Sequence, residues 1–360
     1  MIPRVTATID LSAIRHNLGQ VRRQAPASKV MAAIKADAYG HGAVPVARAL
    51  QDDVDAFAVA CLEEALVLRE ARVRAPLVLL EGILSPEEAR LVLRHELQVV
   101  VHDHWQLAML ESLPAGARIS LWIKLDSGMH RLGFPLTDVP ALWARIQARP
   151  DWQFCGWMTH LACADEPDNE ATPTQVAAFT AALARIPGPR SIANSAGLMA
   201  WPEARADWVR PGLMLYGASP LPGRGAVELG LQPAMKLETR LIAVREYSAG
   251  AAIGYGASYR CPERMRIGVA SVGYADGYHR SLPAGTPVLV RGRVASLVGR
   301  VSMDMINLDL RQAPEAAVGD PVLLWGRELP VEGIASAAGT IAYELLCGLT
   351  NRVRFIHQGG

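Results

Sequence analysis

The first residue whose surroundings suggest chemistry is Lys35, in the stretch IKADAYGHGA (34–43). An apolar run precedes the lysine, and a turn containing Gly40 and Gly42 follows it. A lysine at the end of a buried strand can reach a ligand with its amine, and amines of this kind form covalent bonds with carbonyl groups. Spacing alone leaves a second interpretation open, in which Lys35 is a solvated lysine at a strand end.

Further polar side chains stand where other apolar runs end. A lysine, a histidine, a serine and an arginine occupy such positions at Lys124, His160, Ser195 and Arg210. Each also has a simpler interpretation, for example a hydrogen-bonded core histidine for His160 or a salt bridge to Asp126 for Lys124. The position of all four at the ends of apolar runs is better evidence for a functional site than any one of these residues alone.

The elements that must position these groups are short apolar runs alternating with helical patterns. Most of the runs are continuous rather than alternating, as strands buried on both faces are. Eight runs of strand length occur in the first 220 residues, at 29–35, 56–60, 76–82, 97–103, 118–126, 153–161, 190–195 and 208–217.

Helical signals lie between several of these runs. Residues 10–24 place Leu11, Ile14, Leu18 and Val21 on one face, and the segment SPEEARLVLRHE (85–96) begins with a predicted capping box. Eight strands alternating with helices predict an α/β fold, an N-terminal (β/α)8 TIM-like barrel. A doubly wound sheet is the alternative, but no GxGxxG follows any strand, so dinucleotide binding has no support.

The pattern changes near residue 228. Segments 237–250, 266–278, 286–310 and 320–326 are rich in Val, Ile and Leu, are punctuated by glycine and mostly alternate. They predict a C-terminal, mostly antiparallel β domain. The predicted domains are 1–228 and 229–360, joined through the Pro- and Gly-rich segment SPLPGRGAVELGLQP (219–233).

In a barrel of this kind the active site forms at the C-terminal ends of the strands, and a phosphate site commonly forms after strands 7 and 8. Here those loops read ANSAG and RPGLMLYG, which offer the Ser195 hydroxyl and backbone N–H groups near Gly212 and Leu213. A phosphate on one wall and a lysine on the first strand predict a phosphorylated aldehyde cofactor, and pyridoxal phosphate (PLP) is the obvious candidate.

Composition excludes several other classes of protein. The net charge is +1, from 36 basic and 35 acidic residues without a Lys/Arg run, so nothing favours nucleic acid or an anionic membrane. No apolar run has the length of a membrane span, and the N-terminus lacks the apolar region of a signal peptide. Five cysteines without a CxxC pair suit a reducing compartment, so a cytoplasmic location is expected. The histidines of VHDH (101–104) lack a third ligand motif, so no metal is expected.

The motifs together resemble those of alanine racemases. AIKADAYGHG resembles the PLP-lysine motif of that family. Eight further motifs match in order across nearly the whole chain, namely KLDSGMHRLG, MTHLACADE, ANSAG, VRPGLMLYG, IGYGASYR, VGYADGYHR, GRVSMD and AYELLC. The resemblance implies PLP-dependent interconversion of L- and D-alanine by a homodimer, in which each active site lies between the barrel of one subunit and the β domain of the other.

The resemblance also implies a role for each matching residue. Lys35 would carry PLP and act as one acid–base group, and Tyr255 of the other subunit would be the second. Arg210 would face the pyridine nitrogen with His160 as its support, while Arg131 and the Met303 backbone would bind the substrate carboxylate. The phosphate ligands would be Tyr39, Ser195, Gly212, Leu213 and Tyr343. The substrate corridor would be formed by Asp165, Tyr274, Arg280, Arg300 and Ile341, with Cys163 on its wall. Lys124 matches a lysine that is carbamylated in several relatives.

Three other functions are weighed against this one. A PLP barrel decarboxylase of diamino acids would place an acidic residue where this chain has Arg210. A single-domain PLP-binding protein would lack the second domain that carries Tyr255 and Met303. A broad-spectrum periplasmic racemase is disfavoured by the absence of a signal peptide.

Overall fold

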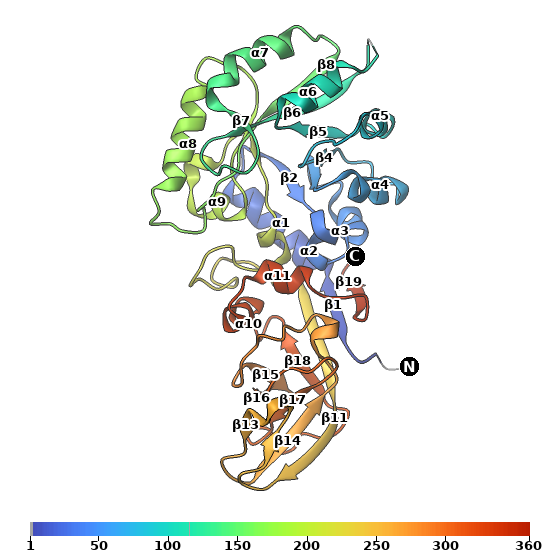
Figure 1. The fold of residues 1–360 in the computed structure, drawn as a ribbon, viewed down its shortest axis with the longest axis vertical. Helices are drawn as coiled ribbons and strands as arrows, with labels where there is room; N and C mark the ends of the chain where they lie inside the picture. The colour runs from blue at the N-terminus through green and yellow to red at the C-terminus, as the bar shows by residue number, and fades with distance from the viewer. Residues whose placement is uncertain (1–2, 115) are drawn as a thin grey trace. The chain divides into compact units, whose positions relative to one another are not determined.

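The computed structural model of the protein describes residues 3–114 and 116–360, so residues 1, 2 and 115 of the predicted first domain lie outside the described part. The chain divides into two compact units (Figure 1). The barrel unit holds Asn17–Leu215 and Pro220–Arg224. The C-terminal unit holds Gly225–Gly360, the crossing segment Tyr216–Ser219 and the N-terminal residues up to His16.

The barrel unit contains a closed parallel sheet of eight strands. The strand order is β5-β4-β3-β2-β10-β9-β8-β6, and pairing of β5 with β6 closes the ring. All eight predicted strands are present, which confirms the (β/α)8 TIM-like barrel. Their bounds are β2 Lys29–Ala33, β3 Ala56–Val59, β4 Leu77–Leu79, β5 Gln98–Val101, β6 Ile119–Asp126, β8 Trp152–Met158, β9 Arg190–Ser191 and β10 Trp208–Val209; a two-residue strand, β7 Phe134–Pro135, pairs with β6.

Small and large side chains fill the barrel interior together. Ala56 and Ala58 are fully buried beside Trp122, whose indole N–H donates to Gln98 Oε1 at 2.8 Å. The ring of Trp122 reaches the backbone of the neighbouring strand, where a Cβ added to Gly156 would lie 2.7 Å from Trp122 Cζ3. Glycine at 156, with a φ of +149°, therefore makes room for the largest side chain of this core.

Helices connect the barrel strands, and α1 and α5 lie where the sequence predicts helices, at 10–24 and 85–96. In α1 the apolar face predicted from Leu11, Ile14, Leu18 and Val21 is buried. The right-handed helices are α1 Leu11–Gln24, α3 Ala43–Leu50, α4 Leu62–Glu70, α5 Pro86–Arg94, α6 His104–Glu111, α7 Val139–Gln147, α8 Ala171–Ala182 and α9 Ser195–Ala200, with 3-10 turns η1 Leu136–Asp138, η2 Pro202–Ala204 and η3 Leu213–Tyr216.

The predicted capping box of α5 is only half present. Ser85 accepts a hydrogen bond from Glu88 N at 3.2 Å, as expected. The Glu88 carboxylate, however, accepts from the N–H of Leu84, one residue before the cap, at 2.7 Å. A glutamate in the first turn thus reaches one residue further back than the capping-box pattern predicts.

The C-terminal unit is built on one eight-stranded sheet. The order is β14-β17-β16-β15-β18-β11-β1-β19, and β14 also pairs with β11, so six antiparallel strands close on themselves. The predicted antiparallel β domain is confirmed. The bounds are β11 Met235–Tyr247, β14 Met265–Ala270, β15 Pro287–Val290, β16 Arg293–Val298, β17 Ile306–Asp309, β18 Pro321–Trp325 and β19 Arg354–Gln358, with the hairpin β12 Ala252–Ile253 and β13 Tyr259–Arg260, the turns η4 Tyr255–Ala257 and η5 Tyr274–Asp276, and helices α10 Val331–Ala338 and α11 Ala342–Cys347.

One strand of this sheet comes from the N-terminus and was not predicted. Strand β1 (Thr6–Asp10) pairs antiparallel with β11 and parallel with β19, with Thr6 opposite Arg354. The first residues therefore share a sheet with the last ones. No helix in the described part of the chain is long and apolar enough to cross a membrane.

Candidate active site

Lys35 lies just beyond the end of β2, from which Ile34 separates it, close to where the strand-end lysine was expected. The backbone that follows is unusual, because Ala36, Asp37, Ala38 and Tyr39 all have φ between +50° and +55°. Four consecutive residues in this region form one left-handed turn, α2 (Lys35–Gly40), and the N–H of Ala38 donates to Ile34 O at 2.8 Å. Each such non-glycine residue costs roughly 1–2 kcal/mol, so surrounding contacts must hold the turn in place.

The wall predicted to bind phosphate is assembled in the barrel unit. Ser195 Oγ accepts hydrogen bonds from the N–H groups of Gly212 (2.8 Å) and Met214 (3.3 Å). The hydroxyl of Tyr39 lies against the same segment, since a Cβ added to Gly212 would be 2.5 Å from Tyr39 Oη. A side chain at 212 would therefore occupy the space in front of this hydroxyl. Tyr39, Ser195, Gly212 and the next residue, Leu213, are brought together as predicted.

Arg210 is buried among neutral acceptors. Its Nη1 donates to Ser191 Oγ at 2.7 Å, and its Nη2 donates to the carbonyls of Thr159 (2.5 Å) and Ile192 (3.1 Å). Among the described residues, no carboxylate pairs with this guanidinium. Burial lowers the pKa of Arg210 to about 10, which still leaves the group protonated at neutral pH.

His160 meets Arg210 as an acceptor. Its Nδ1 lies 3.3 Å from Arg210 Nη2. Burial, followed by the charges of Arg210 and Lys124, lowers the pKa of His160 well below its ordinary value. The imidazole is therefore neutral at physiological pH, and its Nδ1 can accept a hydrogen from Arg210 rather than repel it.

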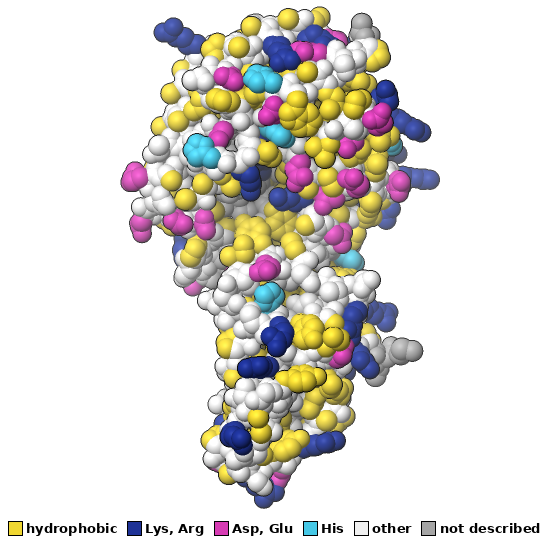
Figure 2. Space-filling model, viewed as in Figure 1, with side chains coloured by type: hydrophobic (Ala, Val, Ile, Leu, Met, Phe, Trp, Pro, Cys, Tyr) yellow, Lys and Arg dark blue, Asp and Glu magenta, His cyan; other side chains and the backbone are white. Residues whose placement is uncertain are grey.

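Lys124 adds a second amine close to these cations. Lys124, Arg131 and His160 line one small pocket of the barrel unit, and Lys and Arg side chains lie within a hollowed part of this unit's surface in Figure 2. Burial, and then the charges of Arg210, Arg131 and Lys35, lowers the pKa of Lys124 to about 8, while Asp126 opposes the shift. The cluster has an excess of positive charge that an anionic ligand would neutralise.

The loop that carries the predicted corridor residues Cys163 and Asp165 is held by buried groups. Gln175 Oε1 accepts from Ala162 N at 2.9 Å, and its Nε2 donates to His160 O at 3.1 Å. Asp165 itself is exposed. The structure therefore places Asp165 at the surface of the barrel unit, on the same loop as His160.

In the C-terminal unit, Tyr255 begins a short turn beside Arg300. A Cβ added to Gly256 would lie 3.5 Å from Arg300 Nη1, so the guanidinium runs alongside the residue that follows Tyr255. Tyr255 is 70% exposed, a large fraction for an aromatic side chain. Its ring is thus available to a group outside the C-terminal unit.

Tyr274 and Met303 are joined by a close approach of two loops. The N–H of Tyr274 donates to Ser302 O (3.1 Å), and that of Ala275 donates to Met303 O (3.0 Å). A Cβ at Gly273 would lie 2.2 Å from Met303 O, so only glycine permits this contact. Met303 is 52% exposed.

The remaining predicted residues of the C-terminal unit are Arg280, Ile341 and Tyr343. Arg280 follows the turn η5 and is exposed. Ile341 is the N-cap of α11 and is 62% exposed, and Tyr343 lies in the first turn of that helix. The seven predicted site residues of this unit thus lie on its loops and helix starts.

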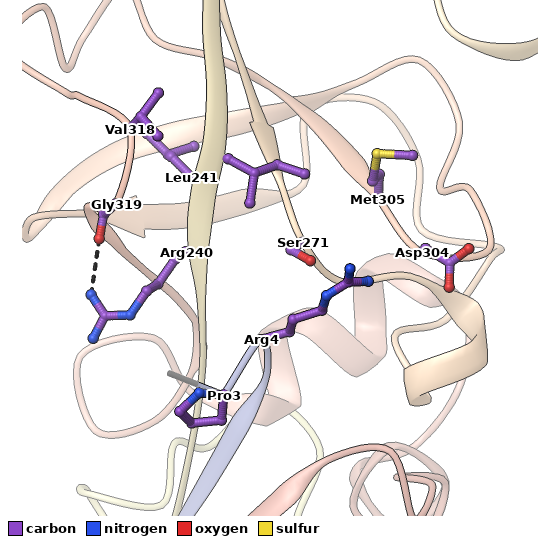
Figure 3. Close-up of a pocket in the computed structure, with 10 residues that line it drawn as sticks. Pro3, Arg4, Arg240, Leu241, Ser271, Asp304, Met305, Val318 and Gly319 are labelled. Atoms are coloured by element: carbon purple, nitrogen blue, oxygen red, sulfur yellow. Dashed lines mark hydrogen bonds between the residues drawn. The ribbon is translucent and has the colours of Figure 1, made fainter. Parts of the chain in front are cut away.

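A pocket of about 590 Å³ in the C-terminal unit contains none of the predicted site residues (Figure 3). Arg4, which precedes β1, extends into the pocket towards Ser271 and Asp304. The guanidinium of Arg240 donates to Gly319 O at 2.9 Å. The other lining side chains are mostly apolar. The described lining contains no cysteine, histidine or lysine, and none of its charged side chains is buried, so it does not point to chemistry here.

Sequence reasoning did not find Ser191 and Thr159, which surround Arg210. Ser191 also donates to Trp208 O at 3.1 Å, and the hydroxyl of Thr159 lies 2.8 Å from that of Ser127. The available signal was weak, a small polar residue inside an apolar strand. Within the described ranges, no group of three His, Cys, Asp or Glu side chains could hold a metal ion.

Comparison with known proteins identifies the family. The family model "Alanine racemase, N-terminal domain" matches residues 9–220, and the model of the C-terminal domain matches residues 234–357. The alanine racemase of Nitrosococcus oceani is 53% identical over 349 residues, which cover 96% of this chain and 97% of that protein. The crystal structure of the biosynthetic alanine racemase from Pseudomonas aeruginosa has a TM-score of 0.96 at 46% identity, covering 99% of this chain and 100% of that chain.

A further crystal structure concerns the cofactor. It is that of the alanine racemase from Bartonella henselae with covalently bound pyridoxal phosphate, which has a TM-score of 0.90 at 28% identity and covers 99% of this chain and 100% of that chain. These similarities extend over both units and over nearly the full length of each relative. The chain therefore belongs to the alanine racemase family, a family of amino-acid racemases.

Proposed function

We propose that the protein interconverts L-alanine and D-alanine with pyridoxal phosphate as its cofactor. The observation that carries the proposal is the environment of Arg210, a buried guanidinium held only by neutral acceptors in the described structure. It lies in the unit that also presents a strand-end lysine and a wall of hydroxyl and backbone N–H groups.

The barrel residues fit the proposed cofactor. Ser195 already accepts two backbone N–H groups, so its own hydroxyl hydrogen is the part that can donate to a phosphate oxygen. Tyr39 Oη lies on the same wall, in the space that a side chain at 212 would fill. Leu213 N, and Tyr343 of the C-terminal unit, are further proposed ligands of the phosphate. Bound pyridoxal phosphate would make the α-hydrogen of an amino acid acidic by drawing electrons away from Cα.

Lys35 is the proposed covalent partner of the cofactor, and the other lysines support this choice. The chain has four lysines. Lys29 lies over the ring of Trp208 at 5.3 Å, and Lys236 pairs with Glu238 at 2.8 Å. Lys124 lies among cations in the same pocket as Arg131 and His160. Lys35 is the one that closely follows the end of the first barrel strand, β2.

Arg210 argues for racemisation rather than decarboxylation or transamination. An arginine cannot give up its proton in practice, so it can only donate a hydrogen bond. Placed at the cofactor's ring nitrogen, Arg210 would disfavour a proton there and keep the ring a weak electron sink. Neutral His160 would accept from Arg210 and hold it in this orientation. Return of the proton to the wrong carbon would thereby be limited.

Racemisation needs a proton removed from one face of Cα and another returned on the opposite face. We propose the Lys35 amine for one face and the Tyr255 phenol for the other. Arg131 and the backbone of Met303 would bind the substrate carboxylate. Arg300 lies alongside the Tyr255 turn, and with Asp165, Tyr274, Arg280 and Ile341 it would line the substrate corridor.

We also propose that two copies of the chain form a homodimer and share their active sites. Tyr255, Met303 and Ile341 are all more than half exposed on the C-terminal unit, although they carry large apolar surfaces. A proton-transfer site must be shielded from water. A second copy whose barrel covers these residues would provide that shielding, with residues 229–360 serving the partner's 1–228 barrel. A two-fold dimer would repeat this contact twice.

Lys124 is the lysine best suited to carbamylation. A pKa of about 8 gives it a substantial fraction of neutral amine near physiological pH. The neutral amine can attack the carbon of CO2, forming a C–N bond and releasing one proton to water. The resulting anion would offset the charges of Arg131 and Arg210. The carbamate on Lys124 would then hold Arg131 in the position in which it binds the substrate carboxylate.

Two biological roles are proposed for the enzyme. The D-alanine formed would supply peptidoglycan synthesis, or the enzyme would serve alanine catabolism, in the cytoplasm in either case. A deletion strain distinguishes the two roles. Dependence on added D-alanine for growth indicates the first, and loss of growth on alanine as carbon source indicates the second.

The activity is tested with a panel of amino acids, with and without pyridoxal phosphate. L- and D-alanine should each approach an equal mixture, because enantiomers have equal free energies, and removal of the cofactor should abolish turnover. Borohydride reduction should then place a pyridoxyl mass on Lys35 among the four lysines. Release of CO2 from diamino acids would identify a decarboxylase, broad turnover would identify a broad-spectrum racemase, and binding without turnover would identify a carrier.

A further inference from the structure

The left-handed turn after Lys35 needs an external support at its start. Ala36, Asp37, Ala38 and Tyr39 hold φ angles that L-residues rarely adopt singly, and here they do so four times in a row. Lys35 stands immediately before this turn, and Tyr39 is its last strained residue. The conformation of the turn therefore sets the spacing between an amine and a phenol that are both assigned to the cofactor.

The support comes from Glu64, which is 28 residues further along the chain. Its Oε1 accepts a hydrogen bond from the N–H of Ala36 at 2.6 Å. Its Oε2 accepts from the N–H of Ala60 at 2.7 Å. One carboxylate thus joins the exits of the neighbouring strands β2 and β3 and fixes the peptide between Lys35 and Ala36.

The far end of the turn is closed by local groups instead. Asp37 Oδ1 accepts from Ala43 N at 2.6 Å, and the backbone oxygen of Asp37 accepts from Gly42 N at 2.9 Å. The buried ring of His41 has its Nδ1 2.9 Å from Tyr39 O. These contacts lie within a few residues of the turn, so they form wherever the turn itself forms. The contact of Glu64 at the start joins the turn to another strand and helix.

Comparison with Glu88 of the same chain distinguishes the two contacts of Glu64, one at the start of its own helix and one to the left-handed turn. Glu88 stands at the same position of α5 as Glu64 does in α4, and it also accepts from the N–H of the residue before the N-cap, Leu84. That contact is an ordinary helix-start interaction. The bond from Glu64 to Ala36 is additional, and among the described residues Glu88 makes no counterpart to it.

We propose that Glu64 is a positioning residue that holds the left-handed turn and thereby places Lys35 and Tyr39. This inference rests on the roles proposed above for those two residues. This role requires no contact of Glu64 with the cofactor or the substrate. Glu64 acts through the N–H of Ala36, which it binds with one carboxylate oxygen, while the other oxygen binds the N–H of Ala60 at the exit of β3.

The test uses four variants of the full-length protein. Glu64→Ala removes both bonds, and Glu64→Gln retains one acceptor oxygen. Glu88→Ala is the matched control, because it removes the helix-start contact of α5 without touching the turn. Glu63→Ala removes an exposed charge from the first turn of α4 itself. Binding of pyridoxal phosphate to the apoprotein, kcat and KM for alanine, and the crystal structure of residues 34–43 are measured for each.

The expected pattern is specific to the turn. Glu64→Ala should lower kcat by about tenfold or more and weaken cofactor binding by about tenfold, with KM for alanine changed by less than about twofold, since misplacing a reacting group by about 1 Å can cost about a hundredfold in rate. Glu64→Gln should fall between Glu64→Ala and wild type. Glu63→Ala and Glu88→Ala should stay within about twofold of wild type in kcat and cofactor affinity.

A compensating substitution gives an independent readout. Ala36 is exposed, and glycine adopts its φ of +51° without strain. In an Ala36→Gly background the turn depends less on its support, so the loss of cofactor affinity caused by Glu64→Ala should shrink by about threefold or more. A structural defect elsewhere in α4 would not respond to residue 36.

The outcomes are separable. If Glu64→Ala binds cofactor and turns over like the two control variants, or if residues 36–39 keep their left-handed angles and their position in its crystal structure, Glu64 is not the positioning residue. If Glu64→Ala does not fold, Glu64→Gln and the Ala36→Gly background decide by the same criteria. A wild-type protein that neither binds pyridoxal phosphate nor racemises alanine overturns the proposed function, and this inference with it.

Discussion

The guanidinium of Arg210 and the imidazole of His160 meet at 3.3 Å, between Nη2 and Nδ1, in the interior of the barrel unit. A cation and a base at this distance are compatible because His160 is neutral. Burial and the nearby charges of Arg210 and Lys124 lower its pKa well below the ordinary range. In this pair Arg210 donates and His160 accepts. This contact orients the guanidinium, which can only donate hydrogen bonds to a ligand.

Replacing Arg210 by glutamate should change the outcome of the reaction as well as its rate. A carboxylic acid at this position can share a proton with the cofactor's ring nitrogen, which arginine cannot do. Racemisation should fall by about a hundredfold, and the fraction of turnovers that end in transamination should rise by about tenfold. Arg210→Lys is the control, because it retains the charge and remains a donor. An unchanged ratio of transamination to racemisation in Arg210→Glu would remove the assigned role of Arg210.

His160 should make the protein less stable on acidification. Its folded pKa is lowered, so below about pH 6.5 the unfolded chain binds a proton that the folded chain does not. Stability should therefore fall as the pH drops, by up to about 1.4 kcal/mol per pH unit from this group. His160→Asn keeps an acceptor for Arg210 and does not titrate. Urea unfolding midpoints at pH 7 and pH 5, at one protein concentration, should differ less for His160→Asn than for wild type; equal differences would contradict the buried neutral state.

Lys124 should take up CO2 more readily than an ordinary lysine. With a pKa of about 8, its neutral fraction rises steeply between pH 7 and pH 9. After incubation with ¹³C-labelled bicarbonate, a carbamate resonance should appear, grow across this pH range and be absent from Lys124→Ala. Lys236 is the internal control. Its amine forms an ion pair with Glu238, so it should not contribute to this resonance. A signal that survives Lys124→Ala would assign the carbamate to another amine.

The two proposed proton-transfer groups should be separable by isotope exchange. If Lys35 serves the α-hydrogen of D-alanine and Tyr255 that of L-alanine, Tyr255→Phe should retain exchange of solvent deuterium into D-alanine. Exchange into L-alanine should fall by at least about a hundredfold, because one general acid or base typically accelerates a reaction by about that factor or more. Both rates are followed by NMR before racemisation proceeds. Equal loss from the two enantiomers would show that the residues do not act on separate faces.

Subunit mixing should reveal whether Lys35 and Tyr255 of one site come from different chains. Lys35→Ala and Tyr255→Phe homodimers should each be nearly inactive. In a random mixture about half of the dimers are hybrids, and each hybrid has one intact site if the sites are shared. Activity should recover to roughly a quarter of wild type, assuming independent sites.

A tagged subunit of each kind, purified in sequence, provides the control that hybrids have formed. Inactive hybrids would show that both residues of a site belong to the same chain. A mixture that recovers activity without hybrid formation would instead indicate contamination by wild-type protein.

The sequence by itself determined the barrel and most of the candidate site. Strands buried on both faces read as continuous apolar runs, and all eight were visible for that reason. In a parallel barrel the carboxyl ends of the strands share one face, so Lys35, Lys124, His160 and Arg210 could be grouped from order alone. The nine motifs of the resemblance then named the family.

Tertiary structure alone decided three further features. Strand β1 joins β19 across nearly the whole chain, and such a pairing leaves no local signal. The turn at 36–39 places alanine, aspartate and tyrosine in a conformation that glycine favours, and the N–H of its first residue is bound by Glu64, which is 28 residues away. The pKa values of His160 and Lys124 depend on burial and on charges from other strands. Each of these is set by groups far apart in sequence, so only the folded chain fixes it.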